Sequence, residues 1–240
     1  MSHKFFDTSF LNTVKNWNIK DYFRQLSIVI VGIVITFLAS DVISYQSKQK
    51  EVEKITGMIK EELKDNLKSL YYLQSRLELE FNLYNLIRKN LNDFSNLPQD
   101  SLQKYQSLPG NDYRHLFKTQ SFDVFKNSGL IPHIKNKVFL NKLFSCYNSL
   151  QFSQEWINTY YNDKTKATQK WLSTLSIKEA QHLYKEEAYS SIDPSQYWKL
   201  ILANDNTRNF YINALGYLET IINECQKTEK LLQETLQNFE

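Results

Sequence analysis

The first residues to consider for chemistry are two carboxylates, Glu78 and Glu80, in the sequence LELEF. A pair of carboxylates that share one site is the arrangement used in acid–base hydrolysis of glycosides. On a helix, however, residues two positions apart point to different sides, because neighbours on one face are three or four positions apart. Their spacing therefore argues against a shared acid–base site.

The histidines and the known catalytic motifs indicate no other chemistry. His115, His133 and His182 lie too far apart in the sequence to form a local metal-ligand motif. The sequence contains no Gly-rich phosphate loop and no HExxH, GxSxG or EF-hand pattern. We therefore expect no catalytic residues, no metal site and no cofactor, and the sequence identifies no small-molecule substrate.

The cysteines and tryptophans leave alternatives open. Cys146 and Cys225 are the only cysteines, and they could pair in an oxidising compartment or remain buried free thiols. Trp156, Trp171 and Trp198 could line a ligand pocket. Large aromatic side chains pack in cores more often, so we expect core positions for these three.

Asp41 stands out because it follows a long apolar run, LSIVIVGIVITFLASDVI, over residues 26–43. A carboxylate near the end of a hydrocarbon layer is costly unless it reaches the interface, a partner helix or water. Asp41 is thus either a boundary residue or a mark of a helix contact or pore mouth. Gly32 and Ser40 form a small-residue notch that could receive a second helix.

The apolar run itself is expected to be a transmembrane helix over residues 25–44. Its Leu, Ile, Val and Phe residues contribute roughly −4 to −7 kcal/mol to insertion, and its length of about 27 Å approaches that of a hydrocarbon core. A cleaved signal peptide would need small residues before the cut, where Phe37 or Leu38 stands instead. The run is also too long for a buried strand. Representative span residues are Leu26, Ile30, Gly32, Ile33, Phe37 and Leu38.

The remaining chain predicts an all-α fold. Residues 1–24 are expected to be an amphipathic or loosely ordered leader, and residues 45–97 a long stalk helix that continues the span. Apolar residues from Val52 to Ile87 recur every three or four positions, which marks one buried face. Charged neighbours such as Lys60, Glu61 and Glu62 are interpreted as the solvated face. Residues 98–240 are expected to form a helical bundle on the stalk, with a last helix from about Asp205 to Phe239 that is long enough to lie antiparallel to it.

A helix stop is predicted in SFDVFKNSGLIP. Lys126 and Ser128 precede Gly129, which supplies a positive φ, and Leu130 or Ile131 closes the hydrophobic contact. We expect a new helix to start near Asn136 and to run toward Trp171.

Three stretches together resemble a family of uncharacterised bacterial single-pass membrane proteins. They are IVIVGIVITFLA (residues 28–39), EVEKITGMIKEELKDNL (residues 51–67) and SFDVFKNSGLI (residues 121–131). The last helix is similar to that family's closing segment, whereas Ser44 and Tyr45 replace its usual Asn-Trp pair. The resemblance implies a basic leader, an uncleaved anchor and a helical domain in a bacterial membrane, and it implies no activity.

Charge and topology complete the expectations. The net charge of +3 is scattered, with no basic stripe, so nucleic acid binding is not indicated. Lysines and arginines are balanced across the span; a short basic leader favours an inner amino terminus and a large domain outside the bacterial cytoplasmic membrane. We expect a non-enzymatic, membrane-anchored binding, assembly or sensing protein in a complex, with the lipid bilayer and a protein partner or homo-oligomer as partners. The alternative is a subunit of an oligomeric membrane effector or channel with Asp41 at the pore.

Overall fold

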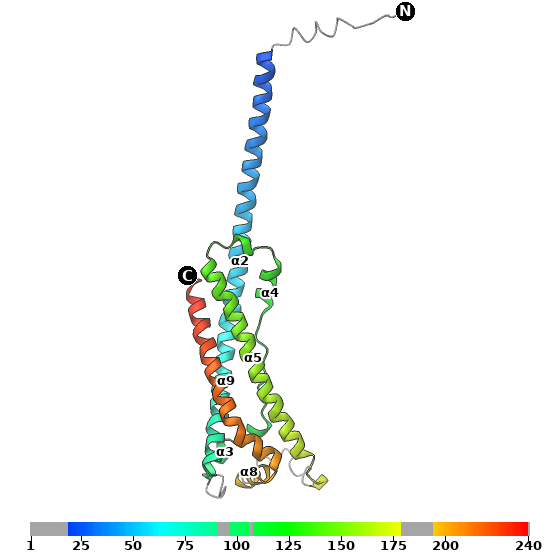
Figure 1. Cartoon of the computed structure of the whole chain (residues 1–240), viewed down its shortest axis with the longest axis vertical. Helices are drawn as coiled ribbons and strands as arrows, with labels where there is room; N and C mark the ends of the chain where they lie inside the picture. Colours follow the sequence, from blue (N-terminus) through cyan, green and yellow to red (C-terminus); the bar gives the residue numbers. More distant parts are fainter. Residues whose placement is uncertain (1–18, 91–96, 106–107, 179–193, 240) are drawn as a thin grey trace, which may run out of the picture. The chain divides into compact units, whose positions relative to one another are not determined.

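The computed structural model describes residues 19–90, 97–105, 108–178 and 194–239, and every regular element in these ranges is helical (Figure 1). The chain divides into two compact units, Met1–Lys54 and Ile55–Glu240. Most of the predicted leader lies outside the described residues. The elements are α2 (Ile19–Lys89), α3 (Gln99–Lys104), η2 (Leu108–Gly110), α4 (Gln120–Asn127), η3 (Ile131–His133), α5 (Lys137–Leu172), α8 (Pro194–Ala203) and α9 (Asp205–Gln237).

Helix α2 supplies the described part of the first unit and continues into the second. In the second unit its apolar stripe is buried as predicted, with Ile59, Leu63 and Leu77 fully inaccessible to solvent. The helix ends at Lys89, before the predicted limit at residue 97. One prediction about the polar residues beside the stripe is wrong: Glu62 is 6% exposed and belongs to the core, not to the solvated face.

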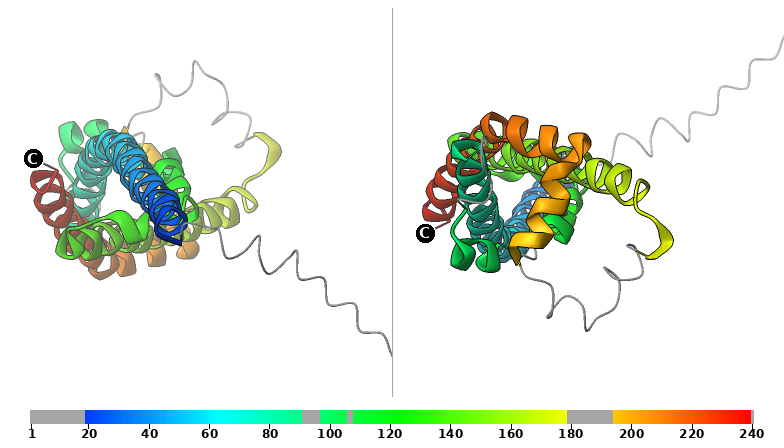
Figure 2. Two further views of the ribbon diagram at one scale, coloured as in Figure 1. Left: turned by 90° about the horizontal axis from the view of Figure 1, so that it is seen from above. Right: turned by 90° about the horizontal axis from the view of Figure 1, so that it is seen from below.

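Helices α5 and α9 lie side by side and run in opposite directions (Figures 1 and 2). The ring of Phe139, near the start of α5, contacts that of Phe239 just beyond the end of α9, at 4.8 Å between centroids. Further along, Tyr160 of α5 contacts Phe210 near the start of α9. Rising residue numbers on one helix thus meet falling numbers on the other. Both helices begin where expected, with Asn136 and Asn204 as N-caps.

Helix α9 also runs opposite to α2, whereas α2 and α5 run in the same direction. Gln233 of α9 donates to the Tyr71 hydroxyl, and Tyr211 packs on Tyr84. The partners of α2 on α5 rise together, because Tyr147 binds Glu62 and Lys164 binds Glu80. Two helices in sequence order can be parallel only if the chain between them returns to the starting end.

Residues 112–119 make part of this return as an extended connection alongside α5 (Figure 1). The His115 amide donates to Asn158 and the Phe117 amide donates to Gln154. Two residues of the connection thus span the length of four helical residues, which is about 6 Å. A chain segment of two residues reaches this length only when it is nearly fully extended. An extended chain cannot form hydrogen bonds between its own backbone groups. Here side-chain amides supply the hydrogen bonds that a neighbouring β-strand would otherwise make. Asn66 of α2 does the same for both backbone groups of Lys118, at 2.8 Å each.

Candidate functional site

The apolar stretch predicted as a span lies within α2, and its side chains are exposed. Among the residues that the structure describes, α2 is the one helix long and apolar enough to cross a membrane. Its most apolar 18-residue window has a mean hydropathy of 2.5, and none of that window is buried. The representative span residues Leu26, Ile30, Ile33, Phe37 and Leu38 are 40 to 68% exposed.

Polar groups within this stretch are satisfied by the helix itself. The hydroxyls of Ser27 and Thr36 donate to the carbonyl oxygens of Phe23 and Gly32, at 2.7 and 2.8 Å. Such bonds reduce the penalty for a hydroxyl in an apolar environment. Ser40 and Asp41 are exposed. Gly32, Thr36 and Ser40 follow each other at intervals of four, so one helix face carries the small residues.

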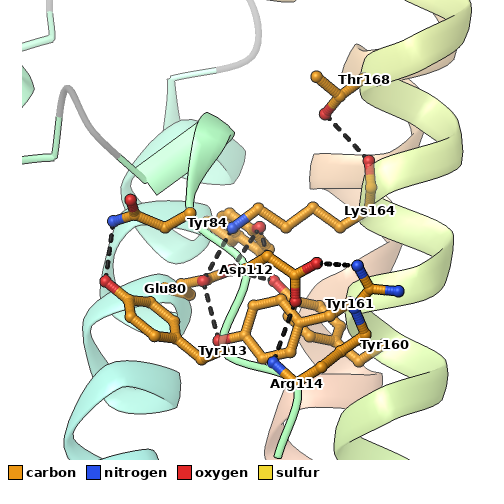
Figure 3. A network of polar contacts seen from close by, with 10 residues as sticks. Glu80, Tyr84, Asp112, Tyr113, Arg114, Tyr160, Tyr161, Lys164 and Thr168 are labelled. Atoms are coloured by element: carbon orange, nitrogen blue, oxygen red, sulfur yellow. Dashed lines mark hydrogen bonds and ion pairs between the residues drawn. The ribbon is translucent and has the colours of Figure 1, made fainter.

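The second unit contains a buried polar network around Glu80 (Figure 3). The Glu80 carboxylate is inaccessible and accepts hydrogen bonds from the hydroxyls of Tyr84 at 2.9 Å, Tyr161 at 3.1 Å and Tyr160. The ammonium group of Lys164, with a side chain 2% exposed, lies 2.8 Å from the same carboxylate. Four donors thus converge on one carboxylate, and we call this group the Glu80 network.

Burial sets the protonation of the Glu80 network. Loss of hydration, and then the charge of Glu80, raises the pKa of Tyr84, Tyr160 and Tyr161 well above the usual value. Burial lowers the pKa of Lys164, and the Glu80 charge opposes this effect. The three tyrosines therefore remain neutral donors, which is the state that the hydrogen bonds require.

Glu80 and Lys164 are both enclosed in the core, so the network ties α2 to α5. Glu78, by contrast, is exposed, so the two carboxylates lie in different environments on α2. The network itself was not predicted. One local pattern could have indicated it. Tyr160, Tyr161 and Lys164 lie within one helical turn of the buried face of α5, so a lysine at this position predicts a buried acidic partner.

A second buried carboxylate, Glu62, joins α2 to both α4 and α5. It accepts hydrogen bonds from the backbone amides of Ser121 at 2.7 Å and Phe122 at 3.4 Å, in the first turn of α4. The Tyr147 hydroxyl of α5 donates to it at 2.5 Å. A negative charge that binds the first amides of a helix acts as its cap. Glu62 therefore caps α4 from another helix, in a position where Thr119 makes no capping bond of its own.

These tyrosines predict a steep loss of stability in alkaline solution. In the folded state the pKa of Tyr84, Tyr147, Tyr160 and Tyr161 is raised by burial and then by the neighbouring carboxylates. Their stabilising contribution is complete below the unfolded pKa near 10 and is lost as the pH rises toward the folded values, at about 1.4 kcal/mol per pH unit for each. We expect tyrosinate absorbance to rise in two phases, with the second coincident with loss of helical circular dichroism. Full ionisation of all tyrosines before unfolding would contradict this prediction.

The predicted helix stop after α4 is confirmed. Gly129 has φ +72°, Ser128 is the C-cap of α4, and the following Leu130 is buried. The Ser128 hydroxyl donates to the Phe125 carbonyl and accepts from the Leu130 amide. Lys126 pairs with Asp123 at 2.7 Å, and this pairing lowers the pKa of Asp123. The turn sets the direction of the chain into η3 and α5.

Two glycine substitutions should have opposite effects on stability. A Cβ at Gly129 would meet no atom within 4 Å, so Gly129→Ala tests the positive φ alone and should lower the free energy of unfolding by about 1 kcal/mol. Gly216, inside α9, also has open space around it, and Gly216→Ala should raise the free energy of unfolding by about 0.5 to 1 kcal/mol. Urea titrations followed by circular dichroism measure both. Equal effects of the same sign would contradict the assignment of the turn.

The remaining candidate residues do not gather into a chemical site. The described residues hold no group of three His, Cys, Asp or Glu side chains that could bind a metal ion, and His182 lies outside them. Cys146 and Cys225 are free and buried, and burial raises the pKa of each thiol to about 12. Trp171 and Trp198 are buried, as expected for core residues, whereas Trp156 is only half-buried, so the expectation of a core position was wrong for it.

Comparison of the chain with protein-family models, with curated proteins and with solved structures found no match. The resemblance to a bacterial single-pass family therefore remains a prediction.

Proposed function

We propose that this protein is a membrane-anchored, non-enzymatic binding or assembly protein, in which residues 25–44 cross a bilayer once and the second unit is an antiparallel helical bundle. The observation that carries the proposal is the apolar window of α2, which has a mean hydropathy of 2.5 and contains no buried residue. An exposed surface of this size and composition would not persist in water, because burying each large apolar side chain contributes about 1.5 to 3 kcal/mol. A helix that is apolar on all sides is stable when lipid surrounds it.

The second unit supports binding better than catalysis. Its titratable cluster is enclosed, as the 0% exposure of Glu80 shows, and it ties helices together. The residues that hold α4, α5 and the extended connection all belong to α2: they are Glu62, Asn66, Glu80 and Tyr84. The helix that carries the proposed anchor therefore also organises the domain that would meet a partner, which suits an assembly or sensing role.

The alternative is a homo-oligomeric effector or channel subunit. The observation that favours it is the face formed by Gly32, Thr36 and Ser40, where small side chains would allow a second copy to approach closely. Asp41 follows directly, and a carboxylate in such a position would be satisfied at a polar axis between copies. One helix cannot enclose a pore, so this alternative requires several copies.

Native mass spectrometry of the full chain in detergent distinguishes the two functions. A monomer, or a complex with a different protein, supports the anchored binding protein. A stable homo-oligomer that dissociates in Gly32→Leu supports the alternative, with Gly57→Leu, at an exposed helical position outside the stretch, as the control.

The proposed location is the cytoplasmic membrane of a bacterium, with the helical domain on the outer side. The family resemblance and the arrangement of a short basic leader before an uncleaved apolar run support this orientation.

A further inference from the structure

One face of α5 carries a row of polar side chains that extends beyond the segment bound to it. Asn148, Gln151, Glu155, Asn158 and Asn162 follow at intervals of three or four residues, so they share one face of the helix. The carboxyl-terminal half of this row holds the extended connection: Asn158 binds both backbone groups of His115, and Asn162 binds the Arg114 side chain.

The amino-terminal half of the row lines an open cleft of about 500 Å³. The connection ends at Thr119, where α4 begins, and no described segment covers Asn148 and Gln151. Within the described residues the side-chain amides of Gln120 and Asn148 make no hydrogen bond, and Gln151 donates only to Glu155, at 3.0 Å. The cleft thus presents amide groups of the same kind, on the same helix face, that bind backbone elsewhere in the molecule.

We propose that this cleft binds an extended segment of a partner protein through hydrogen bonds between its backbone and the side-chain amides of Asn148 and Gln151. An amide group both donates and accepts, so it can bind the N–H and the C=O of one residue, as Asn158 does for His115. Asn148 and Gln151 are three residues apart and are therefore separated by about 4.5 Å along the helix, between the lengths of one and two extended residues. The two side chains can therefore reach neighbouring backbone groups of one extended chain.

Charge narrows the class of segment. The cleft is lined by Asp123, Glu155 and Lys126. Lys126 pairs with Asp123, whereas Glu155 accepts a hydrogen bond from Gln151 and has no cationic partner among the described residues, so the lining keeps a net negative charge. A basic segment fits this lining better than an uncharged or acidic one. Leu116, 76% exposed at the edge of the cleft, offers an apolar contact to one of its side chains.

The inference deepens the proposed function and rests on it, because it gives the binding protein a site and a class of partner. The probe for the test is a fluorescent peptide of residues 111–118, NDYRHLFK. This segment is basic, and in the intact protein Asn158 of the row and the neighbouring Gln154 bind it as an extended chain. Fluorescence anisotropy with the full chain in detergent, and with empty micelles as the blank, measures its affinity.

We expect saturable binding that Asn148→Ala with Gln151→Ala weakens about tenfold, since two hydrogen bonds are lost. The matched control, Gln169→Ala with Asn209→Ala, removes exposed amides of α5 and α9 outside the cleft and should leave the affinity unchanged. A peptide of scrambled sequence should bind within about threefold, whereas N-methylation at residues 114 to 117 should abolish binding, because the contacts are to the backbone.

Absence of saturable binding, or equal binding by the cleft variant and the parent protein, overturns the inference. Binding that is lost in Asn158→Ala but kept in the cleft variant also overturns it, because the peptide would then have replaced the internal connection. Carbonate extraction of the membrane tests the anchor without any peptide. A failure of peptide binding is therefore distinguished from a failure of the proposed membrane anchor.

Discussion

Replacing Glu80 with alanine is expected to lower the free energy of unfolding of the second unit by about 3 to 5 kcal/mol. The substitution leaves the Lys164 ammonium group buried without its counter-charge and removes the acceptor of three tyrosine hydroxyls. Domains are stable by only about 5 to 15 kcal/mol, so the variant should be close to unfolding. Urea titration of the detergent-extracted protein, followed by circular dichroism, measures the change.

The chain offers a matched control two residues away. Glu78 is exposed, and Glu78→Ala should change the free energy of unfolding by no more than about 0.5 kcal/mol. Lys164→Met should be milder than Glu80→Ala, because the carboxylate keeps its tyrosine donors. When Glu80→Ala and Lys164→Met are combined, the loss of unfolding free energy should be smaller than the sum of the two single losses, because no unpaired buried ammonium group remains. Equal effects of Glu80→Ala and Glu78→Ala would refute the structural role of the network.

Two arginines in the middle of the apolar stretch are expected to abolish membrane integration. Ile33→Arg and Phe37→Arg each change the insertion free energy by about 3 to 4 kcal/mol. Together they cost about 6 to 8 kcal/mol, which cancels or outweighs the roughly −4 to −7 kcal/mol that the stretch supplies, whereas one alone does not outweigh it. After alkaline carbonate extraction, the double variant should leave the membrane pellet and the single variants should stay in it.

The control places the same charges at the ends of the stretch. Leu26→Arg with Ile43→Arg adds two arginines that can reach the interface with their long side chains, so this variant should remain in the membrane. If the central double variant is retained as well as the control, the stretch is not inserted as a helix through the hydrocarbon.

Local patterns in the sequence were enough to predict several parts of the fold. The apolar stripe of α2, the positive φ of Gly129 and the start of α5 after Asn136 each depend on residues within a few positions of one another. Periodicity and capping preferences describe such short-range features well. The exposed apolar window also follows from composition alone.

The polar ties could not be predicted in this way. Glu62 meets Tyr147, and Glu80 meets Lys164, across more than eighty positions of sequence. A carboxylate beside an apolar stripe resembles a solvated residue until the helix that covers it is known, which is why the expectation for Glu62 was wrong. The extended connection was missed for a related reason. Its backbone partners are Asn and Gln side chains of α5, which have no strand pattern.

The central claim is that residues 25–44 cross the bilayer once, and labelling of cysteines on the two sides tests it most directly. Lys20 and Lys50 are exposed and flank the stretch, while the native Cys146 and Cys225 are buried thiols with a pKa of about 12 and should not react. In intact cells a membrane-impermeant maleimide should label Lys50→Cys, and it should label Lys20→Cys only after the membrane is opened. The reverse pattern would correct the orientation and keep the span. Labelling of both positions from the same side of an intact membrane would contradict the account.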